Sequence, residues 1–413
     1  MTATVSGCRF CEHPLTHTFV DLGMSPLANS YIQAHQYNKM EPFYPLHVYI
    51  CENCLLVQLE EFEKASNIFS DYAYFSSYSD SWLQHAQRYV DMMAERFAFG
   101  TQSQVIEIAS NDGYLLQYFQ AKGVPVIGIE PASNIAKVAS KKGIPTIEKF
   151  FNIETARELV AQGKQADLLI GNNVLAHVPA LNDFVAGIKI VLKPHGIVTM
   201  EFPYILRLID EQQFDTIYHE HFSYFSFYTV ERIFAKHGLT LFDVEEVTTH
   251  GGSLRIFGRH AEDAGFTVSE NVHSLKRMEA REGLQALPKY LSFVKAVRET
   301  KCQILEFLIT AKREGKTVVS YGAPAKGNTL LNFCGVGKDF IDYTVDRSPQ
   351  KQGCLLPGTH IPIFHPDKIT ETKPDYVLIL PWNIKDEVMS QMKHIRDWGG
   401  QFVTPIPEVK VYP

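Results

Sequence analysis

The central part of the chain opens with Val105-Ile106-Glu107-Ile108-Ala109-Ser110-Asn111-Asp112-Gly113, an apolar run that passes into a polar turn and then into a helical pattern over 115–122. The alternation continues with Val126-Ile127-Gly128-Ile129-Glu130 and a helical pattern over 133–142. Two further apolar runs follow at 166–171 and 196–201. Short apolar strands separated by helices are typical of a parallel sheet with helices on both faces. The sequence therefore predicts a Rossmann-like α/β domain in the centre of the chain.

The polar turn after the first strand lies where open α/β sheets bind nucleotide-like ligands, above the carboxyl ends of the strands. Its only glycine is Gly113, so it lacks the Gly-x-Gly-x-x-Gly pattern that lets the backbone approach a pyrophosphate. Glu130 ends the next strand, where an acidic side chain can accept hydrogen bonds from both ribose hydroxyls. These features favour an adenosine that carries a sulfonium and no phosphate. The alternative is a helix start that binds no ligand.

A second α/β pattern occupies the last hundred residues, after a helical pattern over about 275–314 that Pro288 is expected to kink or restart. An apolar run at 317–321 leads into Gly322-Ala323-Pro324-Ala325-Lys326-Gly327-Asn328 and then into a helix. Small residues and a cation at a helix start suit a phosphate. We therefore expect this loop to bind the diphosphate of a nucleotide, although a helix cap without a ligand remains the alternative.

Two Cys-x-x-Cys pairs, Cys8/Cys11 and Cys51/Cys54, stand near the start of the chain. Four thiolates close a tetrahedral Zn²⁺ site and leave no position for water, which predicts a structural zinc site rather than a catalytic one. The alternative is a set of unpaired buried cysteines. The other cysteines lack such spacing and are expected to be ordinary small apolar residues.

The composition is that of a folded chain of 413 residues, with 45% hydrophobic and 21% charged residues and room for two or three domains. The net charge of −7 argues against non-specific binding to nucleic acid or to an acidic membrane surface. The chain begins without a signal-peptide pattern and has no apolar run long enough to span a membrane. We expect a cytoplasmic protein, a monomer or weak homo-oligomer, with no nucleic-acid or membrane partner.

A polar run, Tyr218-His219-Glu220-His221, is followed at once by aromatic residues. Each of these polar groups needs a partner once it is buried, which makes the run a candidate for acid–base chemistry in a dry pocket. His221 is favoured as the general base because the pKa of imidazole lies near the working pH. In an extended strand the two histidines would share one face, and Tyr218 and Glu220 the other. The alternative is a structural loop whose polar groups satisfy one another.

Together, these motifs resemble those of the S-adenosylmethionine-dependent sugar C-methyltransferases of unusual-deoxysugar biosynthesis. The resemblance covers nearly the whole length and rests on the four cysteines together with Leu22-Gly23-x-x-Pro26-Leu27-Ala28-Asn29, 107–113, 218–224, Gly251-Gly-Ser-Leu-Arg255 and 321–328. It implies a small zinc-binding domain at 1–75, a central class I methyltransferase domain at 76–270, and a linker helix with a second Rossmann-like α/β domain at 271–413. It also implies S-adenosylmethionine and a structural Zn²⁺ as cofactors, and a nucleotide-linked keto sugar, with thymidine diphosphate favoured, as the substrate.

The resemblance gives individual residues expected roles. His221 is the base at the sugar, with Tyr218 and Glu220 beside it, while His219 is left with a structural role. His177 is a further active-site histidine, and one tyrosine of the 72–78 stretch, with Tyr72 or Tyr74 as the candidate, reaches the same site. The residues expected around S-adenosylmethionine are Glu107, Ala109, Asn111, Asp112, Gly113, Glu130, Asn172 and Asn173. Those expected around the nucleotide-sugar are Gly322, Ala323, Lys326, Gly327, Asn328, Asp346 and Lys351.

Methylation of a carbon next to a ketone requires a base that removes the carbon-bound proton and donors that stabilise the resulting enolate. The predicted reaction is therefore transfer of the methyl group to a ring carbon beside the ketone of a keto-deoxysugar. Methylation of an oxygen or nitrogen on another small molecule would not need an enolate and is the alternative reaction. A non-catalytic zinc-containing binding protein is disfavoured by the acidic net charge and by the lack of a basic, aromatic-interleaved patch.

Overall fold

The computed structural model describes residues 6–64, 67 and 75–413. The chain divides into two compact units, each assembled from three separate stretches of sequence. Unit 1 comprises Met1–Thr16, Cys51–Tyr204 and Phe222–Ala286, and unit 2 comprises His17–Ile50, Ile205–His221 and Leu287–Pro413. The exact domain limits 1–75, 76–270 and 271–413 stay a prediction.

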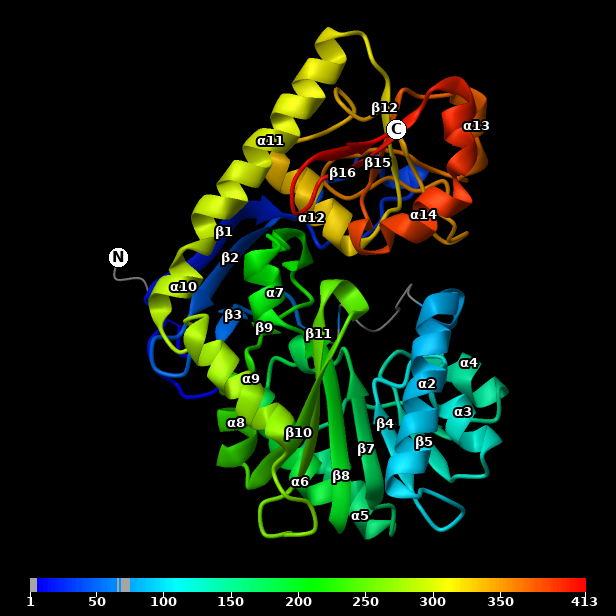
Figure 1. Ribbon diagram of the computed structural model, residues 1–413. Coiled ribbons are helices and arrows are strands. Elements are labelled where there is room, and N and C mark those ends of the chain that lie inside the picture. Colours follow the sequence, from blue (N-terminus) through cyan, green and yellow to red (C-terminus); the bar gives the residue numbers. More distant parts are fainter. Residues whose placement is uncertain (1–5, 65–66, 68–74) are drawn as a thin grey trace. The chain divides into compact units, whose positions relative to one another are not determined.

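Unit 1 contains a seven-stranded sheet in the order β10-β11-β8-β7-β4-β5-β6 (Figure 1). The strands are β4 (Val105–Ile108), β5 (Val126–Ile129), β6 (Thr146–Ile147), β7 (Ala166–Asn172), β8 (Leu192–Pro203), β10 (Leu239–Val247) and β11 (Ser253–His260). The strands from β8 to β6 are parallel to their neighbours, whereas β11 is antiparallel to both β8 and β10. The predicted α/β sheet is confirmed, with an antiparallel hairpin added at one edge.

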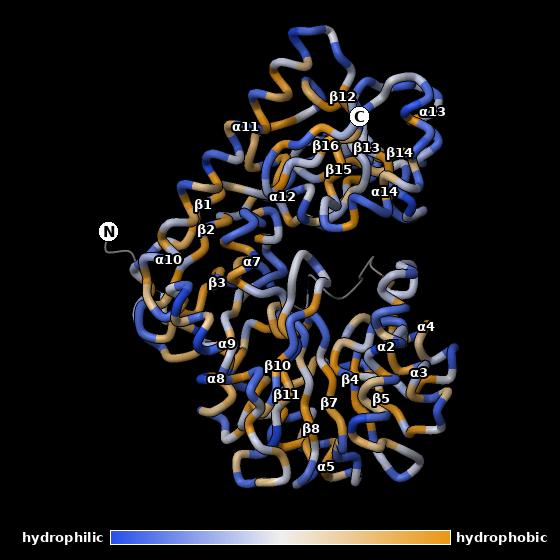
Figure 2. The backbone as a smooth tube through the Cα atoms, in the orientation of Figure 1, coloured by the Kyte–Doolittle hydropathy of each residue, from blue (hydrophilic) through white to orange (hydrophobic). Residues whose placement is uncertain are grey.

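Helices enclose this sheet, which explains why its strands are apolar without alternation. All four residues of β4 and of β5 are buried, so both faces of each strand are covered, and apart from Glu107 these residues carry no polar side chain. Val105, Leu168 and Ile170 pack in one cluster with Tyr89 and Met93 of α2. Figure 2 shows the hydrophobic colour concentrated along these strands. The helices of unit 1 are α2 (Asp80–Phe97), α3 (Leu116–Ala121), α4 (Ser133–Lys141), α5 (Ile153–Ala161), α6 (Leu181–Val191), α8 (Phe227–Lys236) and α9 (Glu270–Arg281).

Unit 2 contains a six-stranded sheet in the order β14-β13-β12-β15-β16-β17. Its strands are β12 (Val318–Tyr321), β13 (Thr344–Val345), β14 (Ile363–Phe364), β15 (Tyr376–Ile379), β16 (Gln401–Thr404) and β17 (Lys410–Tyr412). All neighbours are parallel except β16 and β17. The helices of unit 2 are α7 (Ile205–Asp210), α10 (Leu287–Leu291), α11 (Phe293–Arg313), α12 (Ala325–Cys334), α13 (Asp367–Thr372) and α14 (Lys385–Gln391). The second α/β unit expected from the sequence is confirmed.

Shorter elements complete both units. In unit 2, β1 (His17–Ser25) pairs antiparallel with β2 (Tyr44–Ile50). In unit 1, β3 (Val57–Leu59) pairs antiparallel with β9 (Ser223–Tyr224). Short 3-10 helices include η2 (Ser76–Tyr78), η3 (Leu175–His177), η4 (Phe214–Thr216) and η5 (Thr249–Gly251). Most of the stretch between the two cysteine pairs, His17–Ile50, belongs to unit 2, although the cysteines themselves belong to unit 1.

The helical pattern over 275–314 forms separate helices rather than one. Pro288 lies in the first turn of α10, where its missing N–H costs no helical hydrogen bond. Helix α11 buries one stripe of side chains, which includes Val297, Ile304 and Leu308. Leu291 is the last residue of α10 and is 41% exposed.

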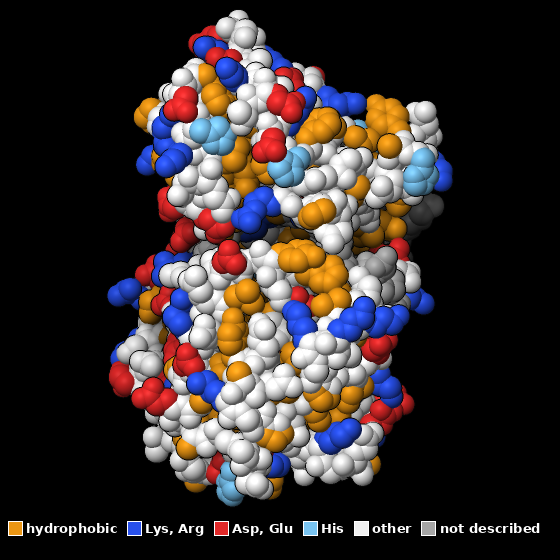
Figure 3. Space-filling view, turned by 90° about the vertical axis from the view of Figure 1, so that its right-hand side faces the viewer, with side chains coloured by type: hydrophobic (Ala, Val, Ile, Leu, Met, Phe, Trp, Pro, Cys, Tyr) orange, Lys and Arg blue, Asp and Glu red, His pale blue; other side chains and the backbone are white. Residues whose placement is uncertain are grey.

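On the face drawn in Figure 3, basic and acidic side chains are intermixed among the described residues rather than gathered by sign. No described helix combines the length and the apolar character that a membrane crossing requires.

Candidate functional site

The four cysteines meet in unit 1. Their Sγ atoms all lie within 4.8 Å of one another, with 3.5 Å between Cys8 and Cys54 and 3.5 Å between Cys11 and Cys51. Zn–S bonds of about 2.3 Å in a tetrahedron separate sulfurs by about 3.8 Å, close to these distances. Gln58 Nε2 donates to Cys8 Sγ over 3.1 Å and so supports one ligand from outside the cluster. The donor set and its geometry fit a closed Zn²⁺ site.

The loop after β4 adopts a backbone that few residues tolerate. Ala109 and Asn111 have φ values of 54° and 49°, and Gly113 follows with 76°. At Gly113 an added Cβ would lie 2.2 Å from Cδ1 of Ile144, so only glycine fits there. Strained backbone of this kind collects at ligand-binding loops. The turn is therefore shaped by close packing beneath it and presents its backbone at the carboxyl end of the sheet.

Glu130 holds this loop in place. Its carboxylate accepts a hydrogen bond from the backbone N–H of Asn111 at 3.0 Å and another from that of Ala132 at 2.9 Å. Burial raises the pKa of Glu130. A carboxylate has about four acceptor positions, so two are left for ribose hydroxyls.

Several polar atoms at this edge of the sheet are buried without a hydrogen-bond partner among the described residues. They are Oε2 of Glu107, Oδ1 of Asp112 and both amide atoms of Asn172, a side chain that is 8% exposed. Buried polar atoms are normally satisfied, so this concentration points to a polar ligand. Burial, together with the charge of nearby Glu130, also raises the pKa of Glu107 well above its usual value. These atoms fit an adenosyl group bearing an amino acid, because it offers donors and acceptors to such partners.

The loop after β7 carries the other expected residues of this edge. Asn173 has a φ of 54°, and its Nδ2 lies 2.9 Å from Nε2 of His250. His177 ends η3, directly after this loop. His250 was not among the site residues predicted from the sequence, although it directly precedes the Gly251–Arg255 motif. Tyr72 and Tyr74 lie outside the described residues.

The polar run of unit 2 is a turn, not an extended strand. The backbone N–H of His221 donates to the carbonyl of Tyr218 over 2.9 Å. The turn brings the Tyr218 hydroxyl to 2.8 Å from Nε2 of His221, whose Nδ1 is 2.8 Å from the carbonyl oxygen of Thr216. The division of the run between two faces, which would hold for an extended strand, therefore does not apply to this turn.

The other two residues of the run are buried and point to different partners. Glu220, 4% exposed, accepts a hydrogen bond from Nδ2 of Asn29 over 2.6 Å. His219, 3% exposed, has its Nε2 3.2 Å from the carbonyl of Pro45, and burial lowers the pKa of its imidazole. A neutral histidine on a backbone carbonyl is suited to packing, in keeping with the structural role expected for it.

The loop after β12 is fixed by acidic and basic side chains of unit 2. Asp346 accepts a hydrogen bond from the backbone N–H of Ala323 at 2.8 Å, and Lys351 donates to the Ala323 carbonyl at 2.9 Å. Lys326 instead reaches Oδ1 of Asn383 at 2.9 Å and lies over the ring of Trp382, 4.8 Å from its centroid. Lys351, rather than Lys326, is thus the ammonium in contact with the loop.

Asn328 of α12 carries a buried side-chain amide. Its side chain is 1% exposed, and neither amide atom has a hydrogen-bond partner within the described parts of the chain. The next residue, Thr329, donates to the carbonyl of Ile217 over 3.0 Å and ties the start of α12 to the segment that leads into Tyr218. Asn29 and Tyr31, which contact Glu220 and Ala323, were not among the predicted site residues.

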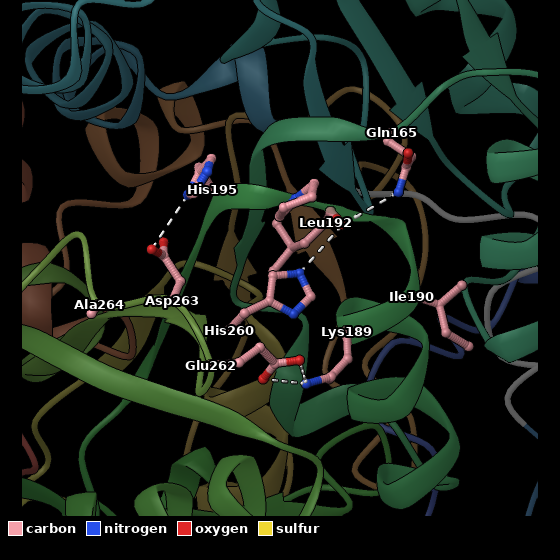
Figure 4. Close-up of a pocket in the computed structure, with 10 residues that line it drawn as sticks. Gln165, Lys189, Ile190, Leu192, His195, His260, Glu262, Asp263 and Ala264 are labelled. Atoms are coloured by element: carbon pink, nitrogen blue, oxygen red, sulfur yellow. Dashed lines mark hydrogen bonds and ion pairs between the residues drawn. The ribbon is translucent and has the colours of Figure 1, made fainter.

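A surface pocket of about 580 Å³ lies at the opposite, amino-terminal edge of the unit 1 sheet (Figure 4). Its ionisable side chains contact one another: Lys189 and Glu262 at 2.7 Å, and His195 and Asp263 at 3.3 Å. Ligands of open α/β sheets bind at the carboxyl ends of the strands. This pocket is therefore not the candidate site.

The α/β sheet of unit 1 has buried polar atoms without hydrogen-bond partners among the described residues at its carboxyl edge, an acidic residue after its second strand, and a four-cysteine site in the same unit. These features define a class I S-adenosylmethionine-dependent methyltransferase. Within that class the chain belongs to the C-methyltransferase family. It is 35% identical to the C-methyltransferase NovU of Streptomyces niveus over 407 residues. These residues cover 98% of this chain and 97% of that protein.

Models of three domains match consecutive parts of the chain. A zinc binding domain matches residues 8–69, a methyltransferase domain residues 82–244, and the C-methyltransferase C-terminal domain residues 248–407. The cofactors are accordingly S-adenosylmethionine and Zn²⁺, as predicted.

Solved structures resemble parts of the chain. The PH0226 protein of Pyrococcus horikoshii is 17% identical and covers 48% of this chain and 99% of its own, with a TM-score of 0.38. A methyltransferase of Listeria monocytogenes is 12% identical over 43% of this chain and 100% of its own, with a TM-score of 0.35. Magnesium protoporphyrin IX methyltransferase of Synechocystis is 15% identical over 47% of this chain and 88% of its own, with a TM-score of 0.32. The family assignment does not depend on these distant likenesses.

Proposed function

We propose that this C-methyltransferase transfers the methyl group of S-adenosylmethionine to a ring carbon next to the ketone of a nucleotide-linked keto-deoxysugar. The observation that carries the proposal is the contact of His221 with Thr216 on one side and Tyr218 on the other. A carbonyl oxygen can only accept, so Nδ1 of His221 carries the proton. Nε2 then has the lone pair of a general base, which carbon–hydrogen cleavage requires.

Tyr218 shares the nitrogen that must accept the proton, and this suggests how the two residues cooperate. When the ketone oxygen replaces Nε2 as the acceptor of the Tyr218 hydroxyl, Nε2 of His221 is released to take the carbon-bound proton. The electron pair of the broken C–H bond becomes the enolate, and the Tyr218 hydroxyl stabilises the charge on its oxygen. S-adenosylmethionine, held by the residues at the carboxyl edge of the unit 1 sheet, would supply a methyl group on a positively charged sulfur. As the enolate carbon bonds to that methyl group, the sulfur–methyl bond would break and its electron pair would stay on sulfur, which leaves as a neutral thioether.

The cofactor residues of the proposal are those at the carboxyl edge of the unit 1 sheet. Glu130 is suited to the ribose hydroxyls, and the unpaired atoms of Glu107, Asp112 and Asn172 to the remaining polar groups. Asn111, Asn173 and the backbone around Ala109 and Gly113 complete this set. His177 and Tyr72 are proposed as further active-site residues on the strength of the family resemblance.

The nucleotide residues of the proposal belong to unit 2. Lys351 offers a charge beside the loop of Gly322 and Ala323, which suits a diphosphate. The unpaired amide of Asn328 suits a polar group of the sugar. Gly327 lets the helix approach Leu380 closely, since an added Cβ would lie 2.9 Å from that side chain. Lys326 contacts Asn383 and Trp382, and Lys351 contacts Asp346 and Tyr31, so both lysines remain candidates for the diphosphate. Thymidine diphosphate is favoured by the family resemblance.

The proposal is tested by incubating the protein with a thymidine-diphosphate-linked 4-keto-6-deoxyhexose and methyl-labelled S-adenosylmethionine in deuterated water. We expect deuterium exchange at a carbon beside the ketone and label on a ring carbon, both read by mass spectrometry and NMR. His221→Asn should slow both by about 10²- to 10⁴-fold, the usual contribution of a general base. Label on oxygen or nitrogen, or methylation that His221→Asn leaves unchanged, would contradict the enolate mechanism.

His219→Asn is the matched control, because it makes the same chemical change two residues away. It removes a buried ring that contacts the backbone of Pro45. We expect it to lower the unfolding temperature while the ring-proton exchange of the folded fraction stays within about twofold of wild type.

A further inference from the structure

The segment after β1 has no part in the mechanism above, although Asn29 ends one of the motifs that the sequence singles out. The zinc binding domain model covers this segment within residues 8–69. In the structure it belongs instead to unit 2, with Glu220 and the loop of Gly322 and Ala323. The question is what Asn29 and Tyr31 do there.

Asn29 supports the carboxylate of the acid–base turn. Its Nδ2 donates to Oε1 of Glu220 over 2.6 Å, across 191 positions of sequence. Glu220 is 4% exposed, and a buried carboxylate depends on such donors to replace water. The amide therefore fixes the position of the Glu220 carboxylate, which belongs to the same turn as Tyr218 and His221.

Tyr31 supports the phosphate loop of the same unit. Its hydroxyl lies 2.6 Å from the carbonyl oxygen of Ala323 and 3.3 Å from Oδ1 of Asn29. Lys351 donates to the same Ala323 carbonyl and lies over the Tyr31 ring, 5.3 Å from its centroid. Burial raises the pKa of the Tyr31 hydroxyl, which keeps it protonated and able to donate.

These contacts form one continuous chain. It runs from Glu220 through Asn29 and Tyr31 to the carbonyl of Ala323 and the ammonium of Lys351. Asn29 and Tyr31 are two positions apart, a span of at most about 7 Å in an extended backbone. A short covalent segment thus links the carboxylate expected at the sugar ring to the ammonium expected at the diphosphate.

We propose that Asn29 and Tyr31 are positioning residues for the nucleotide-sugar. Asn29 holds the Glu220 carboxylate at the sugar ring, and Tyr31 holds the Ala323 carbonyl and Lys351 at the diphosphate. Together they fix the ring relative to the diphosphate, so that the carbon-bound proton faces the base. This inference rests on the proposed function and adds the segment that aligns its substrate.

Substitution of Asn29 should change the reaction rate, whereas substitution of Tyr31 should change the affinity for thymidine diphosphate. A purely structural role would not produce this difference. In the full-length protein, Asn29→Ala should slow ring-proton exchange and methylation about 10- to 100-fold, as expected for losing a hydrogen bond to a buried charged group. The affinities for thymidine diphosphate and for S-adenosylmethionine, measured by calorimetry, should stay within about twofold. Tyr31→Phe should weaken thymidine diphosphate binding about 3- to 10-fold.

A double-mutant cycle tests whether Asn29 acts through Glu220. Adding Asn29→Ala to Glu220→Gln should cost less than threefold more in the exchange rate, because the interaction is already altered. Ser30→Ala is the matched control, since Ser30 is exposed and lies between the two residues. It should leave all rates and affinities unchanged. If Asn29→Ala folds poorly, Asn29→Asp, of the same size, places a second carboxylate against Glu220 and should slow exchange at least as much.

The outcomes separate this inference from the proposed function. Wild type that neither binds thymidine diphosphate nor exchanges the ring proton would overturn both. Active wild type with unchanged exchange in Asn29→Ala and Asn29→Asp would overturn the positioning role alone. A uniform loss of both affinities, the exchange rate and thermal stability in every variant would likewise assign the segment a structural role.

Discussion

Four neighbouring polar residues, Tyr218 to His221, differ in what they can do because a turn sends their side chains to different partners. Tyr218 and His221 meet ring to ring, with centroids 4.1 Å apart. Glu220 turns toward Asn29, and His219 toward the backbone of Pro45. The backbone contact of His221 fixes its tautomer, whereas burial favours a neutral His219.

Asp215 lies just before this turn, and burying its carboxylate lowers the stability of the folded protein. It is fully buried, Trp382 Nε1 donates to its Oδ2 over 2.7 Å, and its Oδ1 has no hydrogen-bond partner among the described residues. Burial raises its pKa to about 6. Between about pH 4 and pH 6 the folded protein keeps a proton that the unfolded chain has released, so stability falls as the pH rises through this window.

Asp215→Asn keeps an acceptor for Trp382 and removes the charge. We expect it to raise the free energy of unfolding by about 1–3 kcal/mol at pH 8, since one pKa unit corresponds to about 1.4 kcal/mol. The gain should shrink toward zero near pH 4, where the wild-type carboxyl is protonated. Urea denaturation at both pH values measures this, with Asp386→Asn as an exposed control. An equal effect at both pH values would show that the charge is not responsible.

At the scale of elements, Glu201 of β8 joins three other elements of unit 1. It accepts hydrogen bonds from His85 of α2 at 2.9 Å, from Arg255 of β11 at 3.0 Å and from Thr249 of η5 at 2.6 Å. Burial alone would raise the pKa of Glu201, but these partners, led by His85, lower it to about 2. The network holds η5, in which His250 has a φ of 54°, at the carboxyl edge of the sheet.

Glu201→Gln should destabilise unit 1. The folded pKa lies below the unfolded one, so the charge stabilises the protein above about pH 4.5 and this contribution is lost as the pH falls toward 2. We expect a loss of about 3 kcal/mol at pH 7, and a smaller one at pH 4, by urea denaturation. Glu245→Gln is the matched control, because Glu245 also contacts Arg255 but is 32% exposed. It should cost less than about 1 kcal/mol. Equal losses for both variants would contradict a special role for Glu201.

For the whole molecule, the zinc site lies where the chain leaves unit 1 and returns to it. Cys8 and Cys11 precede the His17–Ile50 stretch of unit 2, and Cys51 follows it directly. Zn²⁺ bound to these cysteines therefore joins the two ends of the inserted His17–Ile50 stretch. A metal clip of this kind stabilises the folded state because the unfolded chain has no preformed site.

Removing the zinc should therefore affect the stability of the entire chain. We expect Cys51→Ser, or prolonged chelation of wild type, to lower the melting temperature by about 10 °C, as a loss of about 3 kcal/mol would do for a domain of this size. Cys302→Ser is the control, because Cys302 is an exposed free cysteine. Metal analysis should find about one zinc per chain in wild type and in the control. An unchanged melting temperature in zinc-free protein would show that the zinc does not stabilise the folded chain.

The local pattern of the chain determined both α/β sheets, the main helices and the zinc ligands, because strand and helix periods and cysteine spacing are recorded over short stretches of sequence. It also pointed to the polar run and to both loops at the carboxyl ends of strands. Only the tertiary structure decided that 17–50 belongs to unit 2, that Asn29 contacts Glu220, and that Lys351 rather than Lys326 contacts the loop of Gly322 and Ala323. These contacts join residues far apart in the chain, and their partners are chosen by packing and burial of the folded molecule, which no local spacing records.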